Sequence, residues 1–277
     1  MQTENYTNTG RSSPVLILNA LGAGGGTNVE RVRAFWRRIE RYGPGAQVHQ
    51  DPDAAPEKQL IIVSGWACDL RILPDGRRQI FSFLLPGDAI EARGAGSVGS
   101  RGLVALTRLE VVDSGRQLAA DAEGREALTL ALHEAALQRE ERLYDHVVRM
   151  GRLSAKERVI HLLLELRERL ERVGLVDGDT FKIPLTQEIF ADALGLSVVH
   201  INRTLKELRK EGLVSVKSGS ATLHNPRKLA TVSCYVSPSD ALRASAEAWQ
   251  GAPNTWAAET GVSSHQPSRE AVASASR

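Results

Sequence analysis

The chain has 277 residues, of which 42% are hydrophobic and 25% are charged, the proportions of an ordinary globular protein with room for two domains. No stretch approaches the roughly 18 unbroken apolar residues of a membrane-spanning helix. The polar start "MQTENYTNTGRSS" lacks the order of a secretory signal, so we expect a cytoplasmic protein without a membrane partner. Cys68 and Cys234 are too few for a disulfide scaffold or a four-cysteine iron–sulfur site.

The net charge of +2 is unevenly distributed along the chain. Between Val198 and Lys228, seven Lys or Arg residues stand against two Glu, which leaves this segment at +5 and the remainder at −3. Such an asymmetry is typical of a protein that meets a polyanion at one end. On charge alone, a solvated basic helix face is an equally good interpretation. The seven basic residues are Arg203, Lys206, Arg209, Lys210, Lys217, Arg227 and Lys228.

Residues 1–28 are polar and Gly-rich around one apolar run, "VLILNALGAGGGTN". A strand followed by glycines can begin a nucleotide-binding unit. However, Thr27 stands where the dinucleotide motif needs a small residue, and the Gly-Lys-Ser/Thr ending of a phosphate loop is missing. We therefore expect residues 1–28 to be a flexible or lightly packed N-terminal arm.

Residues 29–122 are expected to form a β-roll. From about Gln59 to Val112, short apolar runs alternate with turn signals, as in "LIIVSGWACDLRIL", "RRQIFSFLL" and "GLVALTRLEVVDS". Asp75-Gly76 predicts a hairpin, because its turn needs residues that accept positive φ. The segment "RGAGSVGS", residues 93–100, has glycines at dinucleotide-motif spacing, but no strand and helix frame it, and we interpret it as a connecting loop.

A long helix is predicted over residues 123–152. After Gly124 the segment to Met150 lacks Pro and Gly and is rich in strong helix formers. Apolar residues recur three or four apart along one face, which is ordinary core spacing. The length of about 25 residues favours a helix-to-helix dimer seam instead. The members of this face are Leu128, Leu132, Ala135, Leu143, Val147 and Met150, with Arg139 as the interruption.

Residues 153–230 are predicted to be a winged helix-turn-helix. Ser154 begins a helix as its N-cap and Gly174 ends it. In "LTQEIFADALGLSVVHINRTLKEL", Thr186 caps a short helix, Gly195 supplies a left-handed turn and Ser197 caps the next helix. The buried residues are expected to be Ile189, Ala193 and Leu194 in the first helix and Ile201, Leu205 and Leu208 in the second.

The second of these helices is expected to lie in the major groove of DNA and to contact base edges from its N-terminal half. Arg203 can bond guanine twice and Asn202 can do the same for adenine. The stretch "GLVSVKSGSATLH" predicts a two-stranded wing whose Lys217 meets a phosphate. The candidate DNA-binding residues are Thr186, Gln187, Ser197, Val198, Val199, His200, Asn202, Arg203, Lys206 and Lys217. The alternative to a DNA-binding domain is that three small helices pack together and bind no ligand.

Residues 231–277 contain ten Ala and nine Ser without a sustained period, and we expect a mostly disordered tail. No metal-ligand spacing such as H-E-x-x-H occurs among the seven histidines, so we expect neither catalytic residues nor a metal. Cys68 lies on an expected strand, where a buried small hydrophobe is more usual than a redox switch.

The order of these elements resembles the Crp/Fnr superfamily of bacterial transcription regulators, over about residues 30–228. The resemblance is clearest in "SGWACDLRILPDGRRQIFSFLLPGD" and "LTQEIFADALGLSVVHINRTLKELRKEGLV". It implies an α+β fold with an N-terminal cyclic-nucleotide-binding-like β-roll, a long dimerisation helix and a C-terminal winged helix-turn-helix. It further implies a homodimer that binds a palindromic double-stranded operator and works with RNA polymerase. We expect no cofactor. The alternative is a small-molecule-binding or scaffold protein with a degenerate helix-turn-helix.

Some family residues match and others do not. Arg203 falls on the family's base-contacting arginine and Ser197 on the polar residue at the start of the same helix. Val198 and Val199 replace an Arg and a Glu of better-known members, so we expect a different half-site. The Arg-Ser or Arg-Thr pair that holds the phosphate of a cyclic nucleotide is missing after Pro86-Gly87-Asp88, so we expect no control by cyclic AMP.

Overall fold

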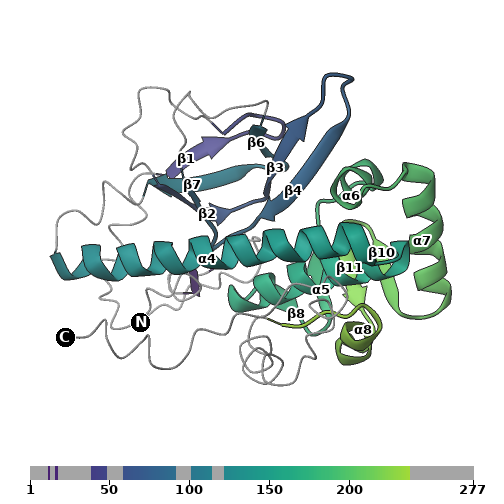
Figure 1. Cartoon of the computed structure of the whole chain (residues 1–277). Helices are drawn as coiled ribbons and strands as arrows, with labels where there is room; N and C mark the ends of the chain where they lie inside the picture. The colour runs from purple at the N-terminus through teal and green to yellow at the C-terminus, as the bar shows by residue number, and fades with distance from the viewer. Residues whose placement is uncertain are drawn as a thin grey trace, which may run out of the picture. The chain divides into compact units, whose positions relative to one another are not determined.

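The computed structural model describes residue 12, residues 16–17, 39–48, 59–91, 101–113 and 122–237 (Figure 1). The elements below belong to one compact unit, which ends at Tyr235. Most of the expected arm, the loop at residues 93–100 and the tail from residue 238 lie outside the described residues. Of the arm, Ser12 and Ile17 are buried, and the Ser12 hydroxyl donates to the carbonyl of Val173 at 2.5 Å.

Among the described residues, seven strands form the N-terminal part of this unit. They are β1 (Ile39–Tyr42), β2 (Gln59–Ser64), β3 (Ala67–Ile72), β4 (Arg78–Leu84), β5 (Ala89–Glu91), β6 (Arg101–Ala105) and β7 (Leu109–Asp113). They pair antiparallel in two sheets, in the orders β1-β7-β2-β5 and β4-β3-β6. Leu60, Ile62 and Val111 from the first sheet share a buried cluster with Ala67, Leu84 and Leu103 from the second. The two sheets therefore enclose one core between them.

The turn between β3 and β4 is the hairpin that Asp75-Gly76 predicted. Gly76 adopts a φ of +85°, and the N–H groups of Arg77 donate to the Asp75 carboxylate. Gly65 makes the tight link between β2 and β3 at a φ of +86°, and a Cβ at this position would collide with the carbonyl of Arg108. Only glycine fits there.

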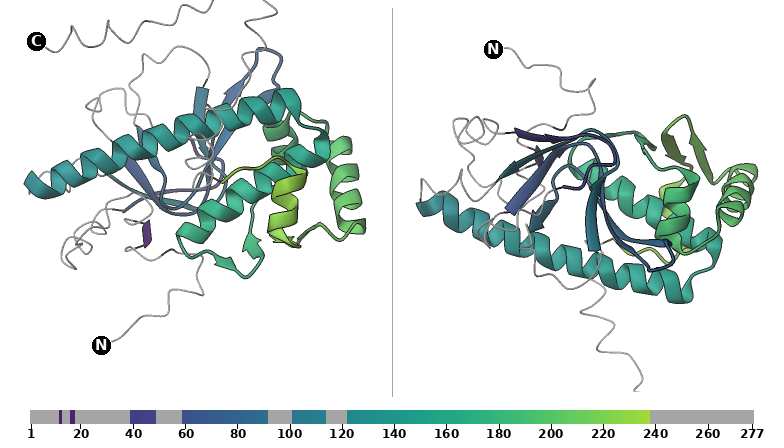
Figure 2. Two further views of the ribbon diagram at one scale, coloured as in Figure 1. Left: turned by 60° about the horizontal axis from the view of Figure 1, so that its bottom comes forward. Right: turned by 90° about the horizontal axis from the view of Figure 1, so that it is seen from above.

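Helix α4 (Ala122–Arg152) has 31 residues and occupies the position of the predicted dimer helix. The views in Figure 2 show it running past the strands, with the later helices gathered near its C-terminal end. One part of the prediction was wrong. Leu132 and Ala135, expected in a seam between two chains, pack instead against Ile61, Val63 and Val112 of this chain's own sheet. The described apolar face that remains exposed is a different one.

The exposed apolar face of α4, called here the outer stripe, is displaced around the helix from the predicted one. It consists of Leu130, Leu137, Tyr144, Val147 and Val148, each between 51% and 67% exposed. Leu130, Leu137 and Tyr144 are seven residues apart, and such a heptad spacing is typical of a helix that pairs with another helix. Val147 is the one residue shared with the predicted face.

The C-terminal part of the unit is a three-helix core with a four-stranded sheet, followed by a short last helix. Its elements are α5 (Ala155–Arg172), β8 (Val176–Asp177), β9 (Thr180–Lys182), α6 (Gln187–Leu194), α7 (Val198–Lys210), β10 (Val214–Lys217), β11 (Ser220–Leu223) and α8 (Pro226–Val232). The sheet has the order β10-β11-β9-β8. The β10–β11 ribbon is the predicted wing, whereas β8 and β9 were not anticipated.

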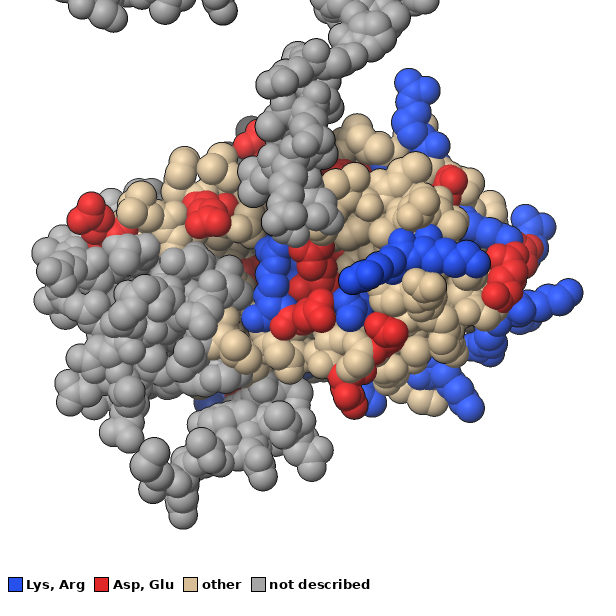
Figure 3. All heavy atoms as spheres, turned by 90° about the horizontal axis from the view of Figure 1, so that it is seen from below, with Lys and Arg blue, Asp and Glu red and all other residues tan. Residues whose placement is uncertain are grey.

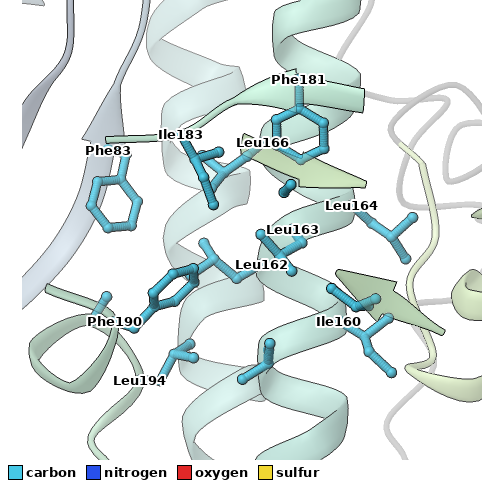
Figure 4. Close-up of a cluster of buried hydrophobic side chains, with 14 of the residues drawn as sticks. Phe83, Ile160, Leu162, Leu163, Leu164, Leu166, Phe181, Ile183, Phe190 and Leu194 are labelled. Atoms are coloured by element: carbon cyan, nitrogen blue, oxygen red, sulfur yellow. The ribbon is translucent and has the colours of Figure 1, made fainter. Parts of the chain in front are cut away.

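Helix α5 is the centre of this packing. Ser154 caps it in a capping box with Glu157, and Gly174 follows its C-cap at a φ of +70°, so both predicted ends are confirmed. Figure 4 shows Leu162, Leu163 and Leu166 of α5 within a cluster that includes Phe83 of β4, Ile183, and Phe190 and Leu194 of α6. The helix thereby joins the strands of the roll to the helix-turn-helix.

The C-terminal limit of this packed part lies beyond the predicted residue 230. Helix α8 runs to Val232, and Ser233 is fully buried. Tyr235 packs edge-on against the ring of His161 and donates its hydroxyl to Glu168 at 2.6 Å. The first residues assigned to the tail are therefore structured.

Candidate nucleic-acid interface

Three residues build the sharp turn between α6 and α7. Thr186 caps α6 by accepting a hydrogen bond from the N–H of Ile189, and Ser197 caps α7 by accepting from the N–H of His200. Gly195 ends α6 in the left-handed conformation at a φ of +60°, which glycine adopts at little cost. These roles agree with the sequence prediction.

The buried side of α7 faces the rest of the three-helix core. Ile201 and Leu208 are fully buried as expected, Leu205 is half-buried, and Thr204 is an unexpected fourth member. In α6, Ala193 and Leu194 are buried as expected, and Ile189 is half-buried while Phe190 is the large buried side chain. The opposite side of α7 is left facing solvent.

A shallow hollow runs along that outward side. It is lined by Gln187, Val198, Val199, Asn202, Arg203 and Lys206. All six are among the residues that the sequence marked as candidates for DNA contact. The structure thus gathers them on one surface, formed by the start of α6 and residues 198–206 of α7.

A hydrogen bond across this hollow joins the two helices. The side-chain amide of Asn202 donates to the side-chain oxygen of Gln187 at 3.0 Å. An Asn amide has two hydrogens and an accepting oxygen, so one donor and the acceptor remain for a base. The bond orients the side chain that would carry out the readout, a role that sequence reasoning did not assign to Gln187.

The other candidates lie around this hollow. His200 is half-buried on the first turn of α7. Thr186 and Ser197 use their oxygens as caps, and each hydroxyl keeps a hydrogen that can be donated to a phosphate. Lys217 is exposed at the end of β10, beside the Ser218-Gly219 turn, in which both residues have positive φ.

The wing is attached directly to the helix that carries the hollow. The guanidinium of Arg209 near the end of α7 donates to the carbonyl of Val216 in β10 at 2.7 Å. This contact ties the wing to α7, so Lys217 and the hollow belong to one surface. The sequence indicated a basic side chain at residue 209 but gave no signal for its partner.

Positive charge surrounds this surface. Figure 3 shows Lys and Arg side chains projecting from the end of the molecule that carries α6 and α7. The side chain of Arg203 is 71% exposed, and its Nε lies 4.0 Å from a carboxylate oxygen of Glu207. The carboxylates of Glu207 and Glu211 are both paired with Lys156 of α5. Those acidic groups are thus partly neutralised by a neighbouring helix.

One hydrogen bond and one ion pair also position the helix-turn-helix, and the sequence analysis predicted neither. Arg158 of α5 donates to the carbonyl of Leu194 at the end of α6 at 3.1 Å, which satisfies a free helix-end carbonyl. Arg78 of β4 pairs with Asp192 of α6 at 2.7 Å. Both are long-range contacts without a local sequence pattern.

A buried cluster of charged residues lies away from this surface, where α4 and α5 meet the roll. Arg169 donates to the carboxylates of Asp88 and Glu165 and to the carbonyl of Phe83, and Arg149 pairs with Glu165. The charges are mutually compensated, as burial requires. Among the described residues there is no group of His, Cys, Asp and Glu that could hold a metal ion, and no helix long and apolar enough to cross a membrane.

A family model described as a Crp-like helix-turn-helix domain matches residues 157–232, which include α6, α7 and the wing. The nitrogen fixation regulation protein FixK of Bradyrhizobium diazoefficiens is 33% identical over 163 residues, covering 57% of this chain and 67% of the relative. FixK of Rhizobium meliloti is 31% identical over 181 residues, covering 65% of this chain and 80% of the relative. The transcriptional activatory protein AadR of Rhodopseudomonas palustris is 29% identical over 192 residues, or 68% of this chain and 78% of AadR.

The fold is found in solved structures as well. FixK2 from Bradyrhizobium japonicum superimposes with a TM-score of 0.57 at 24% identity and covers 72% of this chain and 98% of that one. A CooA mutant from Carboxydothermus hydrogenoformans gives a TM-score of 0.55 at 16% identity, over 78% of this chain and 94% of that one. The β-roll, the long helix and the winged helix-turn-helix follow one another in the order expected for the Crp/Fnr family, and the relatives are transcription regulators. This chain therefore belongs to the Crp/Fnr family of DNA-binding transcription regulators.

Proposed function

We propose that the protein is a sequence-specific regulator that binds a palindromic double-stranded operator as a homodimer, in the cytoplasm and together with RNA polymerase. The observation that carries the specificity is the hollow on α7. It presents Arg203, Asn202 and two valines beside a hydrogen-bonded Gln187. Arg and Asn side chains discriminate bases in the major groove, and apolar side chains discriminate thymine. A surface that contacted only the phosphate backbone of DNA would need only positive charge.

The test of sequence specificity compares Arg203→Ala with Lys217→Ala. Arg203→Ala should weaken binding to the preferred duplex by about 1–3 kcal/mol and leave binding to a scrambled duplex nearly unchanged, because a bidentate base contact is lost. Lys217→Ala should weaken both duplexes alike and reduce the slope of log K against log salt by about 0.9, because it removes one phosphate contact. Fluorescence anisotropy at two salt concentrations measures both effects on a duplex selected from a random library.

Equal losses on both duplexes for Arg203→Ala would show that α7 does not read the sequence. Binding that is weak and indifferent to sequence in the unmodified protein would favour the alternative of a small-molecule-binding or scaffold protein with a degenerate helix-turn-helix.

The homodimer is supported by the outer stripe of α4. Five large hydrophobic side chains stay exposed on one face of a 31-residue helix, and a second copy of the same helix would cover them. A two-fold dimer would also place two copies of α7 against two half-sites, which matches a palindromic operator. The second copy is preferred over another partner because the heptad spacing suits pairing of like helices.

Independence from cyclic AMP is supported by the sequence of the roll after Asp88, where no Arg-Ser or Arg-Thr pair occurs. Isothermal calorimetry with cyclic AMP should show no heat of binding, and DNA affinity should be the same with and without it. A dissociation constant in the micromolar range would overturn this part of the proposal.

A further inference from the structure

Two valines begin α7, and the fold does not account for them. Val199 is 80% exposed, the highest value among the exposed large hydrophobic residues that the structure describes, and Val198 is 39% exposed. Neither contributes its side chain to the core. An apolar side chain that stays in water contributes no hydrophobic stabilisation to the fold.

The helix start does not require these valines either. The first turn of α7 contains no acidic residue, although Asp or Glu there would interact favourably with the helix dipole. Val is also a weaker helix former than most residues because its branched side chain is restricted in a helix. Capping is provided by Ser197 and does not involve the valine side chains. Neither core packing nor the helix start therefore gives Val199 a role within the fold.

We propose that Val199 is a specificity-determining residue that recognises the 5-methyl group of a thymine in the major groove. The inference rests on the proposed binding of α7 to DNA and adds a base preference to it. Thymine is the one base that presents an apolar group in the major groove, and apolar side chains contact it there. Val199 lines the same hollow as Arg203, so both face the same groove.

The spacing of the two residues places this thymine relative to the base read by Arg203. Residues 199 and 203 are four apart and lie on one helix face, separated by roughly one turn of about 5.4 Å. Neighbouring base pairs are about 3.4 Å apart along the duplex axis. The thymine should therefore lie one or two base pairs from the guanine that Arg203 contacts, in each half-site.

The same chemistry predicts which base is rejected. Cytosine lacks the 5-methyl group and carries an amino donor where thymine has its O4 acceptor, and a valine side chain would leave that donor without a partner. A carboxylate at residue 199 would accept a hydrogen bond from this amino group. Val199→Glu should consequently move the preference at this position from thymine to cytosine.

The experiment begins with the unmodified 277-residue chain and a duplex enriched from a random library. Each thymine is then replaced by deoxyuridine, which lacks the methyl group but keeps the Watson–Crick edge. One position in each half-site, next to or one removed from the Arg203 guanine, should lose affinity about fourfold per methyl group removed. Replacement of the other thymines should have a smaller effect.

Variants link this effect to the side chain. Val199→Ser should bind thymine and deoxyuridine duplexes equally at that position, while Val199→Thr, which keeps a methyl group, should still distinguish them. Val232→Ser is the matched control, because Val232 is an exposed valine of α8 in the same domain, outside the hollow. It should retain the discrimination of the unmodified protein.

The proposal fails if no thymine is enriched near the Arg203 guanine, or if every deoxyuridine replacement leaves affinity unchanged. It also fails if Val199→Ser keeps the discrimination. These results are distinct from failure of the proposed function, in which the unmodified protein would enrich no sequence at all. A library selection with Val199→Glu that enriches cytosine at the thymine position would support the assignment independently.

Discussion

At the scale of single residues, burial separates the two cysteines. Cys68 is 1% exposed on β3, and burial, followed by the neighbouring Asp69 charge, raises the pKa of its thiol to about 12. A thiol of this kind is almost never a thiolate at neutral pH and does not react readily. Cys234 is exposed. We therefore interpret Cys68 as a packed core residue and not as a redox switch.

Alkylation provides the measurement. Iodoacetamide at pH 8 should modify one cysteine per folded chain, Cys234, and two per chain in denaturant, as counted by intact mass. The Cys234→Ser variant should be unmodified until it unfolds. Rapid modification of Cys68 in the native protein would contradict its burial and reopen a role in redox sensing.

Two buried histidines are expected to make the free energy of unfolding dependent on pH. Burial, and then the nearby Arg149 charge, lower the pKa of both His146 and His161 from 6.5 to about 4. Arg149 donates toward the Nδ1 of His161, which fits a neutral imidazole that accepts there. Glu165 pairs with the same Arg149 guanidinium. Burial raises the pKa of this carboxyl, but the charges of Arg149 and Arg169 outweigh burial and lower the pKa to about 2.

Between pH 6.5 and 4 the unfolded chain takes up protons on these two histidines, whereas the folded chain does not. The free energy of unfolding should therefore fall as the pH is lowered through this window. The loss should be on the order of a few kcal/mol. Urea unfolding at pH 7, 6 and 5 measures the slope, and His161→Gln should flatten it. A slope that is the same in His161→Gln would show that other groups cause the acid sensitivity.

At the scale of elements, the outer stripe of α4 is expected to hold two chains together. Leu137→Glu should place a charge in the centre of the seam and shift the protein from dimer to monomer, because a buried unpaired charge is costly. Light scattering should then give about the 30.1 kDa chain mass instead of twice that value. DNA affinity should fall at the same time, since two linked half-site contacts become independent.

Val232→Glu is the control for this substitution. It adds the same charge at an exposed hydrophobic residue of α8, away from the outer stripe. This variant should remain dimeric. A monomeric unmodified protein at micromolar concentration, with DNA binding intact, would refute the dimer.

At the scale of the whole unit, Arg169 of α5 connects the helix-turn-helix part to the roll. Its guanidinium bonds the Asp88 carboxylate and the Phe83 carbonyl on the roll while it pairs with Glu165 on its own helix. Removal of one partner from a buried ion pair leaves an uncompensated charge, which typically costs about 3–5 kcal/mol. Arg169→Met should destabilise the protein by about this amount.

Arg172→Met on the same helix serves as the comparison. Its partner Glu168 is near the surface, and a pair of this kind contributes at most about 1 kcal/mol. Chemical denaturation monitored by circular dichroism gives both values. If the two variants lost equal stability, Arg169 would not be a structural link between the two parts.

Local features of the chain could be predicted well because they depend on neighbouring residues. The caps at Ser154, Thr186 and Ser197 are confirmed, as are the left-handed Gly195 and the hairpin at Asp75-Gly76. Each is a backbone preference or a hydrogen bond within about four residues. The order of elements then followed from these boundaries, and the family resemblance supplied their arrangement. The assignment of individual DNA-contacting residues stays a prediction.

The face of α4 that is buried could not be deduced from the helix alone. The segment has apolar residues on more than one face, and its sequence does not say which face meets the roll. Packing against Ile61, Val63 and Val112 decided that Leu132 and Ala135 turn inward and the outer stripe remains exposed. The same holds for the Gln187–Asn202 bond and for Arg169 with Asp88, which join residues 15 and 81 positions apart. The sequence determines short-range geometry because its causes are local, whereas these partners are chosen only when separate elements pack together.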